Sequence, residues 1–114
     1  MPVFHIEKPS KQLYEAWYRL AKSRGARTPI FTCEALFVVD QFGALAGAVG
    51  LHRTATGILV VEDAVLSDGY RLIDRRRVAS FIIAEVKEIA RRDKLLVLCW
   101  ASVILLFWEL SYDS

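Results

Sequence analysis

The chain has 114 residues, of which 54% are hydrophobic and 25% charged, and its formal net charge is +2. This composition predicts one compact domain and excludes a disordered chain, a collagen-like repeat and a small fold held by disulfides. Two cysteines, Cys33 and Cys99, are too few for a disulfide framework or a zinc finger, and we expect both to be reduced, buried thiols.

The first elements to expect are a short strand and a helix. Val3–Ile6 alternates weakly and predicts a strand that ends before Pro9. Ser10 is a typical N-cap for a helix that continues to about Ser23, and Gly25 is suited to end it.

Three strands are expected next. The apolar segments 35–40, 44–52 and 58–66 are separated by short turns, which predicts an antiparallel meander. Gly47 and Gly50 in the second of these segments indicate a bulge or the close approach of another backbone.

The apolar period then changes from strand to helix. From about Leu72 to Arg92 apolar residues recur at helical spacing, segment 95–100 predicts a further strand, and 101–110 predicts a short apolar helix. A strand, a crossover helix and a strand usually pair in parallel with a right-handed connection. The expected fold is α+β, in the order β-α-β-β-β-α-β-α.

Several observations bear on location and partners. The apolar run 95–108 is too short for a membrane span, which needs about 20 residues. The N-terminal sequence MPVFHIEKPSK lacks the apolar stretch of a secretion signal, so we expect a cytoplasmic protein. A mean hydropathy of +0.31 is high for so small a domain, which predicts a second copy or a protein partner that covers apolar surface.

Basic residues gather near the N-terminus and at both ends of the expected helix 72–92. Because the net charge is small and no recognition motif accompanies them, we interpret them as solvated surface and do not expect a nucleic-acid partner.

Three segments carry a family resemblance: ALFVVDQFGALAGAVGLHR, ILVVEDAVLSDGYR and LLVLCWASVILLFWEL. Together with the order of elements, they resemble the GNAT superfamily of acetyl-coenzyme A dependent N-acetyltransferases. The resemblance implies a mixed sheet in which an antiparallel meander leads into one parallel β-α-β step. It also implies acetyl-coenzyme A as cofactor and an amine as acceptor.

The resemblance implies where the cofactor binds. In the family, a loop of the form R/Q-x-x-G-x-G/A binds the pyrophosphate through backbone N–H groups at a helix start. The matching segment begins with Arg71, but Asp74 and Arg76 replace the glycines. The implied cofactor-binding residues are Val65, Leu66, Arg71, Arg75 and Arg76. Arginine side chains, Arg77 among them, are suited to bind phosphate in place of the backbone, and the alternative is a solvated basic helix start.

The implied catalytic groups depart from the family pattern. Glu62 or Asp63 occupies the place of a general base, with Glu62 preferred, and strand alternation points only one of two adjacent side chains to a given face. The alternative is an exposed strand carboxylate. Trp108 replaces a tyrosine that protonates the leaving thiolate in many relatives, and Tyr112 is displaced by about one helical turn.

The C-terminal end of the sequence also departs from the family pattern. Family members usually continue with a final strand pair, whereas this sequence stops at Ser114. We therefore expect the edge of strand 95–100 to need a partner, and the interface candidates are Trp100, Phe107 and Trp108.

Two hypotheses about the function remain open. One hypothesis is a divergent acetyltransferase. The other is a catalytically inactive interaction module in a larger assembly, since the resemblance extends to shortened GNAT-like proteins of tailed phages, some associated with virions.

Overall fold

The computed structural model describes residues 1–29 and 34–99. Within these ranges the chain forms five strands and two helices, all near their predicted positions. They are β1 (His5–Glu7), α1 (Lys11–Ser23), β2 (Glu34–Val39), β3 (Leu45–Arg53), β4 (Ile58–Leu66), α2 (Leu72–Asp93) and β5 (Leu96–Cys99). The expected helix 101–110 lies outside the described residues, as do Cys33, Trp100, Phe107, Trp108 and Tyr112.

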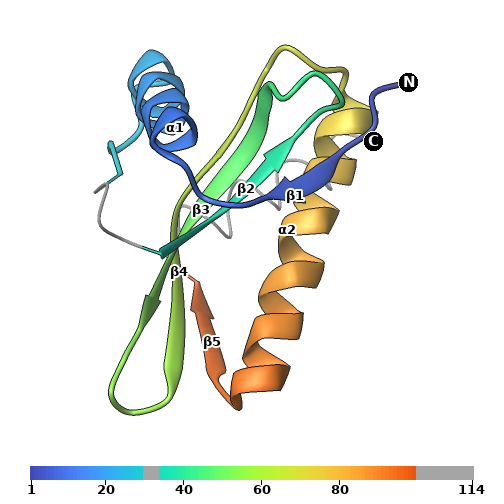
Figure 1. The fold of residues 1–114 in the computed structure, drawn as a ribbon. Coiled ribbons are helices and arrows are strands. Elements are labelled where there is room, and N and C mark those ends of the chain that lie inside the picture. Colours follow the sequence, from blue (N-terminus) through green and yellow to red (C-terminus); the bar gives the residue numbers. More distant parts are fainter. Residues whose placement is uncertain (30–33, 100–114) are drawn as a thin grey trace.

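The five strands form one mixed sheet, and their order in the sheet is their order in the chain (Figure 1). Strands β1 to β4 pair antiparallel, and β5 pairs in parallel with β4, from Ile58 opposite Leu96 to Val61 opposite Cys99. Helix α2 connects β4 to β5. The predicted meander and the single parallel step are therefore confirmed.

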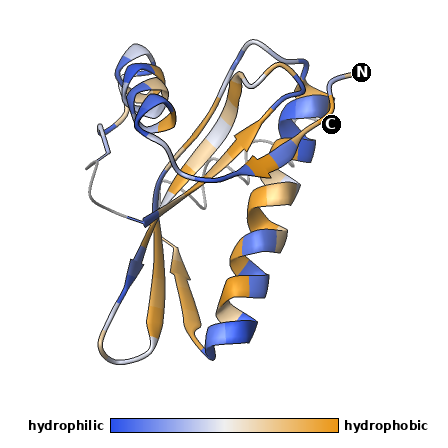
Figure 2. Ribbon diagram, viewed as in Figure 1, coloured by the Kyte–Doolittle hydropathy of each residue, from blue (hydrophilic) through white to orange (hydrophobic). Residues whose placement is uncertain are grey.

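The two helices cover opposite faces of the sheet. Along β2, Leu36 and Val38 belong to the cluster packed against α2, whereas Ala35, Phe37 and Val39 belong to the cluster packed against α1. Successive side chains of a strand point to opposite faces, so this alternation places the helices on different sides. Figure 2 shows the apolar colour concentrated along the strands between the helices.

Local chemistry accounts for the limits of the helices. Oγ of Ser10 accepts a hydrogen bond from the backbone N–H of Leu13 at 3.2 Å, which confirms the predicted N-cap of α1. Gly25 lies beyond the end of that helix with φ +67°, a conformation in which glycine meets no steric penalty. Helix α2 ends at Asp93, and its C-cap residue Lys94 is also left-handed, at φ 54°.

Gly47 explains how closely α2 approaches the sheet. A Cβ atom at this position would lie 2.7 Å from Cγ1 of Val78 and 2.9 Å from Cδ2 of Leu66, closer than real Cβ contacts allow. Only glycine fits between β3 and α2 without displacing these side chains. The close neighbours of Gly47 are side chains of α2 and β4, so the predicted approach of another backbone is wrong at this position.

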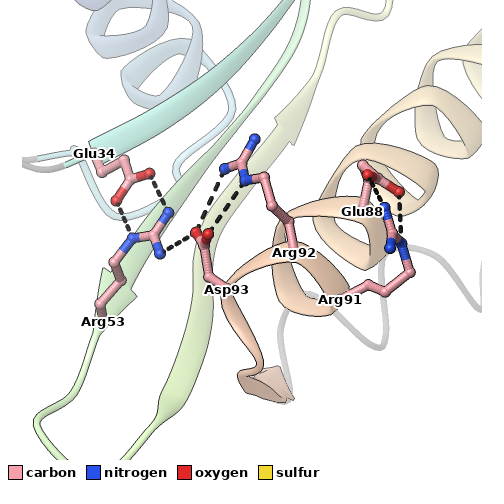
Figure 3. Close-up of polar contacts among 6 residues, drawn as sticks. All are labelled: Glu34, Arg53, Glu88, Arg91, Arg92 and Asp93. Carbon is pink, nitrogen blue, oxygen red and sulfur yellow. Dashed lines mark hydrogen bonds and ion pairs between the residues drawn. The ribbon is translucent and has the colours of Figure 1, made fainter.

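An ion-pair network joins the end of α2 to the sheet (Figure 3). The Arg53 guanidinium donates to Glu34 at 2.9 Å and to Asp93 at 2.6 Å, and Arg92 also contacts Asp93. Hydrogen bonds to Glu34 and Asp93 raise the pKa of Arg53, so this cation stays charged. The network therefore connects β2, β3 and the last turn of α2.

Strand β5 forms one edge of the described sheet and carries exposed apolar side chains, Leu96 at 74% and Leu98 at 56% exposure. The prediction that Cys99 is buried is wrong, because its side chain is only partly covered at this edge. The burial that it does have raises the pKa of its thiol.

Candidate functional site

A bulge in β4 is the first feature of the candidate site. Gly50 pairs with Glu62 and Ala48 pairs with Val65, so Val49 alone lies opposite both Asp63 and Ala64. Asp63 takes up the extra residue with φ 56°, in the left-handed region that non-glycine residues seldom adopt.

The bulge brings two carboxylates to one cation. Arg27, in the segment after α1, contacts both carboxylate oxygens of Asp63, with Nε 3.0 Å from Oδ1 and Nη2 3.2 Å from Oδ2. The same Nη2 lies 3.7 Å from Oε2 of Glu62. The expectation that only one of the adjacent carboxylates reaches a given face is therefore wrong, because the bulge interrupts the alternation of β4.

The backbone of the bulge is held from α1. The indole Nε1 of Trp17, a fully buried residue, donates a hydrogen bond to the carbonyl oxygen of Asp63 at 3.2 Å. Trp17 packs edge-on against Phe37 of β2, with ring centroids 5.7 Å apart. The position of Asp63 is thus fixed by the aromatic core on this face of the sheet.

The two carboxylates differ in exposure. The Glu62 side chain is 22% exposed and the Asp63 side chain 10% exposed. Burial raises the pKa of Asp63, the negative charge of Glu62 raises it further, and Arg27 opposes both effects. Glu62 is the more accessible of the two groups.

The second half of β4 lies beyond the paired length of β5. Pairing with β5 ends at Val61, so within the described part of the chain Glu62–Leu66 has a strand neighbour on the β3 side only. The side chains of Val65 and Leu66 are buried in the clusters of α1 and α2 respectively.

The start of α2 is basic and carries one buried carboxylate. Arg71 is the N-cap residue, makes no side-chain cap and is 73% exposed. Asp74 is 2% exposed, and its carboxylate lies 3.0 Å from Nη1 of Arg77 and 3.5 Å from Nε of Arg71. The Asp74 carboxylate is thus buried and paired with two arginines.

The arginines that follow in the first turns of α2 differ in the contacts that their guanidinium groups make. Arg77 donates to the carbonyl oxygen of Pro2 at 3.0 Å and lies over the Phe4 ring, so its guanidinium holds the N-terminal segment. Arg75 follows the helical spacing of buried Ala79 and Ile82, which places it on the sheet-facing side of α2. Nε of Arg75 and Nη2 of Arg76 are both buried without a hydrogen-bond partner among the described residues, and both side chains belong to half-buried residues; Arg76 makes a further interaction as well.

No protein-family model and no curated protein matches the sequence. Among solved structures, an acetyltransferase of the GNAT family from Staphylococcus aureus superposes with a TM-score of 0.73, covering 97% of this chain and 83% of its own, at 9% identity. A probable acetyltransferase superposes with a TM-score of 0.64, covering 96% and 88%, at 13% identity.

The chain has a GNAT-like fold. The fold class predicted from the order of elements is thereby confirmed, and at these identities the likeness establishes the fold alone. In the described part of this GNAT-like domain, neither helix is long and apolar enough to cross a membrane, and no group of three or more His, Cys, Asp or Glu residues could hold a metal ion.

Two residues of the site were not found from the sequence. Arg27 lies among the basic residues near the N-terminus and Trp17 lies within the expected helix that follows Ser10, yet both contact the bulge. The contacts cross 36 residues for Arg27 and 46 for Trp17. No spacing rule connects positions so far apart in the sequence. The only signal for the Arg27 contact is weak: a basic residue in one segment and two adjacent acidic residues in a strand have opposite charges.

Proposed function

We propose that the protein is an N-acyltransferase that uses acetyl-coenzyme A and acts on an amine. The observation that carries the proposal is the combination of a GNAT-like fold with a bulged β4 that presents Glu62 and Asp63 beside a stretch of strand edge. Acidic side chains at this place are suited to accept a proton from an amine.

Glu62 is the proposed base, because its carboxylate is the more exposed of the pair. Acetyl-coenzyme A would supply an acetyl thioester: the C–N bond forms as the C–S bond breaks, and coenzyme A would leave as its thiolate. The Glu62 carboxylate takes the proton that the amine loses, directly or through one water, and this proton then passes through solvent to the thiolate. Asp63 supports this role by fixing the bulge that orients Glu62.

The start of α2 fits the phosphates of the cofactor through side chains. Arg75 presents a buried guanidinium nitrogen without a hydrogen-bond partner in the described structure, and buried donors normally have one. Arg71 adds an exposed guanidinium at the N-cap, and guanidinium groups match phosphate oxygens. Val65 and Leu66 would contact the remainder of the cofactor with their backbones.

Calorimetric titration with acetyl-coenzyme A tests the proposal. We expect micromolar binding, about −8 kcal/mol, that weakens at least about tenfold in an Arg71→Ala, Arg75→Ala double variant. The control is Arg19→Ala, Lys22→Ala, which removes the same charge from exposed positions of α1. Absence of binding by the folded wild-type protein would overturn the proposal.

A second candidate, an interaction module without chemistry, is favoured by the exposed Leu96 and Leu98 on the edge strand β5. Apolar edge strands that lack charges pair readily with other chains. Light scattering of the wild type should then give a mass above 12.9 kDa. Leu96→Lys, Leu98→Lys should give a monomer, and Phe42→Lys, at an exposed turn, should change nothing.

A further inference from the structure

Arg27 occupies an unusual place for an exposed surface arginine. Its side chain is 65% exposed, yet its guanidinium contacts three oxygens of the two carboxylates at the bulge. The contact with Asp63 is forked, with two nitrogens on two oxygens, a geometry that restricts the orientation of both groups.

The carboxylate pair needs a cation at this position. Glu62 and Asp63 are adjacent in sequence, and burial together with the negative charge of Glu62 raises the pKa of Asp63. The charged groups that act on Asp63 are Glu62 from β4 and Arg27 from the segment after α1. Arg27 is therefore the shared counter-charge of the pair.

A second arginine attaches the same segment without touching the pair. Nη1 of Arg24 lies 3.3 Å from Oδ2 of Asp68, in the loop between β4 and α2. Arg24 and Arg27 thus fix the segment after α1 against the end of β4 and its following loop. Arg24 offers a matched control for the effect of Arg27.

We propose that Arg27 is a positioning residue that holds Glu62 and Asp63 in the arrangement in which Glu62 accepts the proton of an amine. This inference rests on the proposed function for the role of Glu62.

Carbon-13 NMR titration of the side-chain carboxyl groups, in the full chain, tests the assignment. Arg27→Gln should raise the titration midpoint of Asp63 by about one pH unit, because the opposing cation is removed. Arg27→Lys should restore part of the wild-type midpoint, since it returns the charge without the forked geometry. Arg24→Gln should leave the midpoint unchanged.

An unchanged Asp63 midpoint in Arg27→Gln would overturn the assignment, as would an equal shift in Arg24→Gln. Thermal melts of each variant establish that it is folded before titration. Failure of the proposed function is detected by a different measurement, the titration of wild-type protein with acetyl-coenzyme A. The NMR result decides the part of Arg27 independently of that outcome.

Discussion

The hydroxyl of Tyr70 donates a 2.7 Å hydrogen bond to Oδ2 of Asp40. Asp40 follows β2, and Tyr70 immediately precedes the N-cap of α2, so one bond connects the β2–β3 turn to the helix start. The other oxygen of Asp40 accepts from the backbone N–H groups of Phe42 and Ala44. The turn and the first turn of α2 are therefore positioned together.

Tyr70→Phe should destabilise the protein by about 1–2 kcal/mol, because it removes a hydrogen bond to a buried carboxylate. Urea unfolding at pH 7 measures this difference. The bond lowers the pKa of Asp40. Burial, together with the same bond, raises the pKa of Tyr70 to about 12.

The stability difference between the wild type and Tyr70→Phe should depend on pH at both ends of the range. Because folding lowers the pKa of Asp40, the hydrogen bond stabilises the fold at pH values above the pKa of the unfolded state. The greater stability of the wild type should therefore shrink as pH falls below about 4. Because folding raises the pKa of Tyr70, its contribution to stability is fully present at pH values below the pKa of the unfolded state. The greater stability of the wild type over Tyr70→Phe should therefore also decline between pH 10 and about 12. A stability difference between the wild type and Tyr70→Phe that does not change with pH would contradict the assigned roles of Tyr70 and Asp40.

Gly47→Ala should cost about 1–3 kcal/mol, because the new methyl group overlaps Val78 and Leu66 in a packed core. Gly69→Ala is the control, since a Cβ there lies 3.5 Å from Oγ of Ser67, an ordinary contact. Chemical denaturation of both variants compares them. Equal stabilities would show that α2 is free to shift away from β3.

Asp63→Asn should be at least as stable as the wild type at pH 7. The raised pKa of Asp63 means that the folded protein disfavours its ionised form, a cost that is present at neutral pH and absent below the unfolded pKa near 4. Asparagine keeps the tolerance for φ 56°. Urea midpoints at pH 7 and pH 3 measure the effect, and a loss of stability confined to pH 7 would contradict it.

Arg53→Gln should lower the Tm at low salt, and the decrease should shrink in about 0.5 M NaCl, where exposed charges are screened. Arg91→Gln is the control, because Arg91 pairs with Glu88 on the same helix, whereas Arg53 joins β2 and β3 to α2. Calorimetry at two salt concentrations separates the variants. Equal effects would show that the network adds nothing beyond a single surface pair.

Most of the fold could be predicted because local pattern and tertiary structure agree. The change from strand to helical period located β4 and α2, and Ser10 was identified from capping chemistry alone. The bulge at Asp63 was not predicted, because one inserted residue leaves the apolar pattern of Ile58–Leu66 almost unchanged. The burial of Asp74 was missed because it depends on Arg77, which is itself held by the N-terminal segment.

For the candidate site, the sequence pattern places Glu62 in a strand and the basic residues at the start of a helix, while their roles come from the resemblance to the GNAT superfamily. The contact of Arg27 with β4 could not be predicted, since it exists only after α1 has packed on the sheet.

The sequential order of the sheet has a consequence for synthesis on the ribosome. Each strand pairs with the one made before it, so the sheet from β1 to β4 can assemble once residue 66 has emerged. The face that α2 will cover, with Leu36, Val49 and Leu51, then stays open until about 27 further residues are made. At roughly 5–20 residues per second, the nascent chain carries an uncovered apolar face for about 1 to 5 seconds, an interval in which chaperones have access to it.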